Sequence, residues 1–156
     1  MGPLVSKDQY ERVTGYIDSG LSDGAAAAIG GLPTSSRSGF FVEPTVLVGT
    51  TQQMKVQREE IFGPVALPIP FDDEDVVVAK ANNTSYGLAA GIWTRDVTKA
   101  LRVAERLQAG KVWINCYNVF DSSLPFGGYK ESGWGRECSK EALGNYLETK
   151  SVVVAL

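Results

Sequence analysis

The chain has 156 residues, of which 44% are hydrophobic and 21% are charged, as expected for a single soluble globular domain. Its formal net charge of -3 argues against binding to nucleic acid or to an anionic membrane, because both attract basic surfaces. The chain contains no histidine, so we expect no metal site and no Ser-His-Asp or Cys-His catalysis within it. No signal peptide or membrane span is recognisable, and a cytoplasmic location is expected.

The first part of the chain predicts one helix followed by short strands. Ser6 and Gln9 have the spacing of a capping box, which opens a helix, and Gly20 is placed to end it. Pro44 interrupts an extended segment, which predicts two short strands or one edge strand there. Pro68 and Pro70 indicate that the last strand lies at an edge or is irregular. Strands are expected at residues 25–29, 40–48 and 65–71, with a loop at residues 30–38.

From residue 65 onward, strands and helices alternate. Asp72 is expected to cap a helix that runs to Lys80, and Asp96 or Thr94 to cap a second helix that Gly110 closes. This order predicts an α/β fold of the three-layer type, in which helices flank a mostly parallel sheet and crossovers are right-handed. Further strands are expected at residues 88–93 and 111–116.

The end of the chain combines a glycine-rich loop, a short helix and a terminal strand. Glycines recur through residues 127–135, and a short helix is expected at residues 140–143. Residues 146–156 are rich in β-branched side chains, including three consecutive valines, and predict a β-strand arm. Because no repeat or interdomain linker is recognisable, residues 1–156 are expected to form one domain.

An α/β pattern raises the question of dinucleotide binding. Dinucleotide folds leave the amides at a helix N-terminus free to hold pyrophosphate. Here Asp72, Asp73 and Asp96 already occupy the two helix starts, where a carboxylate stabilises the helix dipole and repels phosphate. We therefore predict no self-contained dinucleotide site.

Two adjacent carboxylates, Glu59 and Glu60, precede an Ile61–Phe62–Gly63–Pro64 turn. One interpretation makes one of them an acceptor for ligand hydroxyls and Phe62 a flat wall for a ligand ring. The other is a solvated acidic pair beside a buried aromatic anchor, and the spacing alone favours it. Adjacent residues of an extended segment point to opposite faces, so the pair is a poor acid/base dyad of the glycosidase kind.

The two cysteines, Cys116 and Cys138, are too few for a disulfide framework. A thiol nucleophile needs a lowered pKa or a neighbouring base, and neither is evident, so both are interpreted as structural or inert. Aromatic side chains cluster in residues 117–126. They could line an apolar channel for a small molecule, or pack the loop against the sheet.

Four segments of the chain resemble aldehyde dehydrogenases, in the order in which that family carries them. The resemblance extends over essentially the whole chain, and four ordered motifs at familiar separations are highly specific. The segments are EEIFGP at 59–64, NNTSYGLAA at 82–90, GKVWINCY at 110–117 and PFGGYKESGWGRE at 125–137.

The resemblance implies the fold and activity of that family, the NAD- or NADP-dependent oxidation of an aldehyde to a carboxylic acid. It implies that Glu60 holds the hydroxyls of the nicotinamide ribose and that Phe62 supports the nicotinamide. Asn118, Phe120 and Phe126 match positions that line the aldehyde tunnel. Residues 146–156 resemble the strand that adds to a neighbouring subunit's sheet, so a homo-oligomer, most simply a dimer, is expected.

The chain resembles only about the last third of a typical member of the family. The nucleophilic cysteine, the general-base glutamate, the oxyanion-hole asparagine and the dinucleotide-binding domain of the family all lie upstream of the matched part. We therefore expect no catalytic residue in this chain and no activity from it alone. Strong cofactor binding is not expected either, because one glutamate and one ring must offset an association cost of at least about 4 kcal/mol. The alternative is an assembly module that complements a full-length or split dehydrogenase through its terminal strand.

Overall fold

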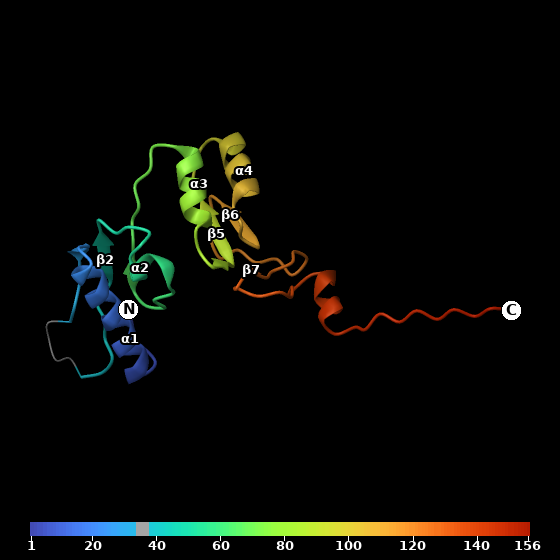
Figure 1. Cartoon of the computed structure of the whole chain (residues 1–156), viewed down its shortest axis with the longest axis horizontal. Helices are drawn as coiled ribbons and strands as arrows, with labels where there is room; N and C mark the ends of the chain where they lie inside the picture. The colour runs from blue at the N-terminus through green and yellow to red at the C-terminus, as the bar shows by residue number, and fades with distance from the viewer. Residues whose placement is uncertain (34–37) are drawn as a thin grey trace. The chain divides into compact units, whose positions relative to one another are not determined.

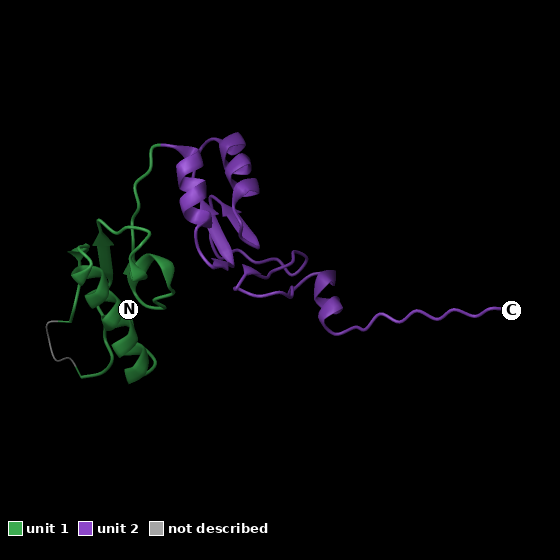
Figure 2. Cartoon of the chain, in the orientation of Figure 1, with its two compact units in different colours: residues 1–72 green, residues 73–156 purple. Residues whose placement is uncertain are grey.

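The computed structural model describes residues 1–33 and 38–156, which form two compact units, Met1–Asp72 and Asp73–Leu156 (Figures 1 and 2). Residues 34–37, part of the loop expected at residues 30–38, lie outside the described residues. This division into two units does not test whether residues 1–156 form one domain, so the single domain stays a prediction.

The first unit begins with helix α1, Lys7–Ser22. The expected N-cap is confirmed, because the Ser6 hydroxyl accepts a hydrogen bond from the Gln9 amide at 3.2 Å. Gly20 does not end the helix. It is buried where α1 approaches two side chains closely, since a Cβ there would lie 3.0 Å from Leu47 and 3.1 Å from Val56. The helix ends two residues later, so this glycine serves packing rather than termination.

A three-stranded sheet follows, in the order β1-β2-β3. Strand β2 pairs antiparallel with β1 and parallel with β3. Both alternatives for residues 40–48, two short strands or one edge strand, are wrong, because only the residues after Pro44 form a strand and this strand is central. The edge or irregular strand expected at residues 65–71 is confirmed as an edge strand, although only two residues form it before Pro68. The bounds are β1 Ala26–Ile29, β2 Thr45–Val48, α2 Lys55–Arg58 and β3 Val65–Ala66.

The core of the first unit lies between α1, β2 and α2. Ile17, Leu47 and Val56 are almost completely buried in it, and each such side chain stabilises the fold by roughly 1.5–3 kcal/mol relative to an exposed one. The buried cluster consists of Val13, Tyr16, Ile17, Ala25, Val42, Leu47, Met54, Val56 and Ile61.

The second unit contains a parallel strand pair joined through a helix. Strands β5 and β6 pair parallel in register from Ala89 with Lys111 to Ile92 with Ile114, as the alternating pattern predicts. Strands β4 and β7 pair antiparallel. The α/β class is confirmed, but among the described residues the strands form three small sheets rather than one. The bounds are α3 Glu74–Asn82, β4 Tyr86–Gly87, β5 Ala89–Ile92, α4 Val97–Arg106, β6 Lys111–Ile114, β7 Tyr129–Lys130 and a 3-10 helix η1 Lys140–Asn145.

Carboxylates cap both α-helices of the second unit. Asp73, rather than Asp72, accepts from the Val76 amide at 2.9 Å, and Asp96 accepts from the Lys99 amide at 2.9 Å. Both helix starts therefore carry the negative charge that argues against phosphate binding there. Helix α4 ends before Gly110, which instead brings two backbone segments together, because a Cβ there would overlap the Gly127 carbonyl oxygen.

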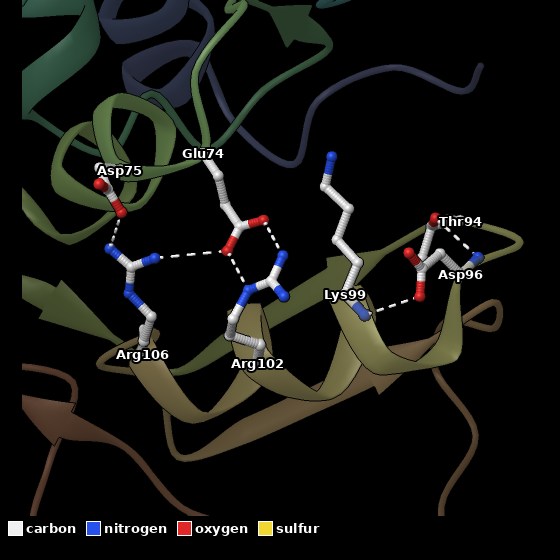
Figure 3. Close-up of polar contacts among 7 residues, drawn as sticks. All are labelled: Glu74, Asp75, Thr94, Asp96, Lys99, Arg102 and Arg106. Atoms are coloured by element: carbon white, nitrogen blue, oxygen red, sulfur yellow. Dashed lines mark hydrogen bonds and ion pairs between the residues drawn. The ribbon is translucent and has the colours of Figure 1, made fainter.

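Ion pairs hold α3 and α4 side by side (Figure 3). Arg102 donates from Nε at 2.7 Å and from Nη2 at 2.6 Å to the Glu74 carboxylate. Arg106 contacts the same carboxylate at 3.4 Å and Asp75 at 2.6 Å. The paired hydrogen bonds from Arg102, together with its charge, hold the pKa of Glu74 below its usual value.

The last ten residues extend away from η1 without regular structure (Figure 1). The strand expected at residues 146–156 does not form within the described chain, and the valines at positions 152, 153 and 154 are 77%, 93% and 74% exposed. A strand requires a second backbone to bond with. Separately, no helix among the described residues is long and apolar enough to cross a bilayer.

Candidate functional site

Residues 59–63, here called the glutamate loop, follow α2 and lie along α1. Gln9 donates from Nε2 to the Phe62 carbonyl at 2.8 Å and to the Ile61 carbonyl at 3.3 Å. One turn further along α1, Arg12 donates to the Glu60 carbonyl at 2.8 Å. These donors fix the backbone of the loop from one side of a helix, because residues three and four apart share a helix face.

The glutamate loop is also held by packing and by one of its own carboxylates. Gly63 lies so close to α1 that a Cβ there would be 2.6 Å from a methyl group of Val13. Tyr16 donates its hydroxyl to Glu59 Oε2 at 2.7 Å. That hydrogen bond, the burial of Tyr16 and the charge of Glu59 raise the pKa of the Tyr16 phenol above its ordinary value.

This arrangement bears on the two interpretations of the acidic pair. Glu59 is a structural partner of Tyr16, whereas Glu60 is exposed and, among the described residues, is held through its backbone. Phe62 is not the buried anchor that the second interpretation required, because its side chain is 73% exposed and its φ is +53°. The buried residue of the loop is Ile61, at 9% exposure. An exposed acceptor and an exposed ring therefore project from a loop of fixed backbone.

The other predicted site residues lie in residues 116–126 of the second unit, here called the aromatic loop. Phe120 and Phe126 meet edge to face with ring centroids 5.3 Å apart, and Phe120 also meets Trp113 at 5.7 Å. Trp113 is 5% exposed and donates from Nε1 to the Val119 carbonyl at 2.8 Å. Phe120 remains 56% exposed. The loop thus packs on the sheet through Trp113 and still presents the exposed ring of Phe120, while the apolar channel stays a prediction.

Asn118 is exposed and has a φ of +57°, a conformation in which asparagine is enriched. The structure brings Phe120 and Phe126 together in the second unit, while Glu60 and Phe62 share a loop of the first unit.

Side-chain and backbone contacts join three of the four family-like segments within the second unit. Asn82 donates to the Arg106 carbonyl at 2.9 Å and accepts from the Gln108 amide at 2.8 Å. Lys130 donates to the Asn82 carbonyl at 2.7 Å. Gly110 meets Gly127 backbone to backbone. These contacts give Asn82, Gly110 and Gly127 a structural role in this unit.

The two cysteines differ in exposure. Cys116 is half-buried and Cys138 is exposed, and Cys138 precedes a 3-10 helix of only six residues. Among the described residues, no group of three or more His, Cys, Asp or Glu side chains could hold a metal ion.

Sequence reasoning missed the residues that support the site. Gln9 was interpreted only as part of a capping box, and Arg12 and Tyr16 carried no interpretation of their function. Their spacing along one side of α1 was a signal, but the loop that they hold is 43 to 53 residues away in sequence. Such a contact is visible only once the fold is known.

The sequence is similar to that of proteins from one known family. The model of the aldehyde dehydrogenase family matches residues 1–152. Betaine aldehyde dehydrogenase of Mesorhizobium japonicum is 54% identical over 157 residues, which cover 99% of this chain and 32% of that protein.

Solved structures of the family superpose closely on this chain. An NAD+ complex of aldehyde dehydrogenase from Bacillus cereus superposes with a TM-score of 0.92 at 53% identity, covering 97% of this chain and 31% of that one. Mycobacterium tuberculosis aldehyde dehydrogenase complexed with NAD+ gives 0.91 at 43% identity, covering 99% and 32%. The chain spans about a third of the length of these relatives. With this sequence match and this fold, the chain belongs to the aldehyde dehydrogenase family.

Proposed function

We propose that this chain supplies the nicotinamide-ribose contact and part of the aldehyde wall of an NAD- or NADP-dependent oxidoreductase that converts an aldehyde to a carboxylic acid. The observation that carries the proposal is the glutamate loop. Its backbone is fixed by Gln9 and Arg12 while Glu60 and Phe62 project into solvent. Preorganised groups lose less freedom on binding and therefore bind more tightly.

The exposed groups of the glutamate loop fit the nicotinamide half of a dinucleotide. A carboxylate is an acceptor with two oxygens, so Glu60 suits a pair of ribose hydroxyls. Phe62 offers an uncovered ring against which a flat heterocycle can stack. The bound cofactor would accept a hydride from the substrate. Both contacts involve only the nicotinamide half, so they are compatible with NAD and with NADP.

The aromatic loop fits the apolar side of an aldehyde substrate. Phe120 and Phe126 form an edge-to-face pair, and Asn118 is an exposed polar residue of the same loop. Apolar walls with a few polar groups are typical of small-molecule sites. We propose these three residues as substrate-binding.

On its own, the polypeptide of residues 1–156 is proposed to be inactive. The chain contains no histidine to serve as a base for either cysteine, and losing a single oxyanion donor already costs roughly 10²–10³-fold in rate. We expect no reduced nicotinamide from any of a panel of aldehydes. Adding the part of the Bacillus cereus enzyme that this chain does not match should restore turnover. In that restored complex, Glu60→Gln should raise the KM for NAD about tenfold, by the loss of hydrogen bonds to a charged group.

A matched variant separates the role of Glu60 from a general effect of charge. Glu105 is an exposed glutamate of α4, and Glu105→Gln should leave the KM for NAD unchanged. Brisk turnover by residues 1–156 alone, or an unchanged KM in the Glu60→Gln complex, contradicts the proposal.

The alternative function, an assembly module, is supported by the exposed C-terminal segment, residues 147–156. Residues 147–156 are extended and carry bare valines, and such a segment can add to the edge of another sheet. We propose a cytoplasmic homo-oligomer, most simply a dimer, that pairs through this tail. Sedimentation should show a dimer for the full chain and a monomer after deletion of residues 147–156. A full chain that stays monomeric at high concentration contradicts this alternative.

A further inference from the structure

Asn115 follows β6 and continues its hydrogen bonding with a side chain. Its backbone amide donates to the Ile92 carbonyl at 2.8 Å. Its side-chain Nδ2 then donates to the Thr94 carbonyl at 2.9 Å, and its Oδ1 accepts from the Thr94 amide at 2.9 Å. A side-chain amide carries the same donor and acceptor as a peptide group. Asn115 therefore bonds to β5 as one further residue of a parallel strand would.

Because the side chain completes the ladder, the main chain is free to leave the sheet at this residue. The φ of Asn115 is +56°, in the left-handed region that asparagine tolerates better than most residues. Immediately after this turn, Tyr117 packs on Trp113 with ring centroids 4.9 Å apart. The Val119 carbonyl then accepts from the Trp113 indole. The turn thus sets the direction in which the aromatic loop begins.

The partner of Asn115 is itself firmly held. The Thr94 hydroxyl accepts from the Asp96 amide at 3.1 Å, and Asp96 caps α4 (Figure 3). Helix α4 is in turn paired with α3 through Arg102 and Glu74. The two side-chain hydrogen bonds of Asn115 therefore connect the start of the aromatic loop to helix α4, which is itself paired with α3.

We propose that Asn115 is a positioning residue, which fixes where the aromatic loop leaves the sheet and so where Phe120 and Phe126 stand against an aldehyde. The part of this inference that concerns substrate binding rests on the proposed function. The choice of residue follows from the chemistry. Aspartate lacks the donor for the Thr94 carbonyl, and glycine adopts the backbone conformation but makes neither side-chain bond.

The test uses hydrogen exchange at tryptophan indoles, measured by NMR on the full chain. The Trp113 indole is bonded to the Val119 carbonyl, so it reports whether the aromatic loop is in place. Trp134 is 97% exposed and serves as an internal reference. Asn115→Gly and Asn115→Asp should each accelerate exchange at Trp113 relative to Trp134 by on the order of tenfold. The reason is that loss of side-chain hydrogen bonding between Asn115 and Thr94 allows the aromatic loop to open.

Asn83→Asp is the matched control, because it makes the same change at an exposed asparagine whose side chain has no hydrogen bond among the described residues. It should retain the protection of Trp113. Wild-type protection in Asn115→Gly would mean that asparagine serves only the left-handed backbone, and would overturn the proposal. Thermal unfolding of each variant shows whether the unit is folded when exchange is measured, and Asn115→Asp keeps the shape of the side chain should glycine prove too disruptive.

A titration with benzaldehyde distinguishes this inference from the proposed function. Shifts of the Phe120 and Phe126 ring signals in the wild type, reduced in Asn115→Asp but kept in Asn83→Asp, support positioning of the aldehyde wall. If the wild type shows no such shifts, but Asn115→Gly and Asn115→Asp still accelerate exchange at Trp113, the aldehyde-binding role of Phe120 and Phe126 is contradicted. The role of Asn115 in fixing the start of the aromatic loop is then supported. Equal shifts in the wild type and in Asn115→Asp overturn the role of Asn115 in positioning that wall.

Discussion

Gly63 shows how one missing side chain allows the glutamate loop to lie against α1. A Cβ at this position would be 2.6 and 2.8 Å from the two methyl groups of Val13. Val13 is completely buried, so it cannot move aside without disturbing the core. We expect Gly63→Ala to destabilise the protein by about 1–3 kcal/mol, the usual cost of overpacking. Urea denaturation would measure this change.

Gly15 provides the control for that substitution. It is an exposed glycine in the interior of α1, and a Cβ there would meet nothing within 4 Å. Gly15→Ala should therefore stabilise the protein by about 0.5–1 kcal/mol, since alanine favours helix over glycine. If both alanines act in the same direction, close packing at Gly63 is not what selects glycine.

At the scale of elements, the α3–α4 contact is expected to make stability depend on pH. The pKa of Glu74 is lowered in the folded protein from an ordinary value of 4.5. Its contribution is therefore fully present above about 4.5 and is lost as the pH falls through the lower, folded value. Glu74→Gln should lower the melting temperature at neutral pH, with a difference from wild type that shrinks below pH 4.5.

The same measurement on Glu105→Gln should show little difference from wild type at any pH, because Glu105 is exposed and takes no part in the α3–α4 ion pairs. High salt should weaken the Glu74 effect, because Arg102 is more than half exposed. A Glu74→Gln difference that stayed constant down to acid pH would show that packing, not charge, connects the helices.

Local signals predicted the starts of helices better than their ends. Ser6 caps α1 as predicted, Asp96 is one of the two caps predicted for α4, and the cap predicted at Asp72 lies one residue further on. Such signals are local, because an N-cap bonds to an amide only three residues away. Gly20 and Gly110 were wrongly assigned as helix ends. In both places glycine is required by a neighbour distant in sequence, Leu47 in one case and Gly127 in the other. A sequence pattern cannot distinguish a glycine that ends a helix from one that admits another backbone.

At the scale of the whole molecule, the resemblance identified the family, and the individual residues could not. Residue reasoning alone favoured a buried Phe62, which is exposed. It left the aromatic loop undecided, because a loop can pack and present surface at once, as Phe120 does. The terminal strand was predicted from composition, yet a strand needs a second backbone, which these residues do not find within the described chain.

Helix α1 has a consequence for how variants of this protein are understood. Among the described residues, Gln9, Arg12 and Tyr16 supply the side-chain hydrogen bonds that reach the glutamate loop, from up to 53 residues away. We expect a substitution on that side of the helix to alter the proposed cofactor contact, although it lies outside every family-like motif. In homologous chains that keep Glu60, we expect positions 9, 12 and 16 of the helix to vary only together with the glutamate loop. Changes on this distant part of the surface are then expected to change the affinity for the cofactor.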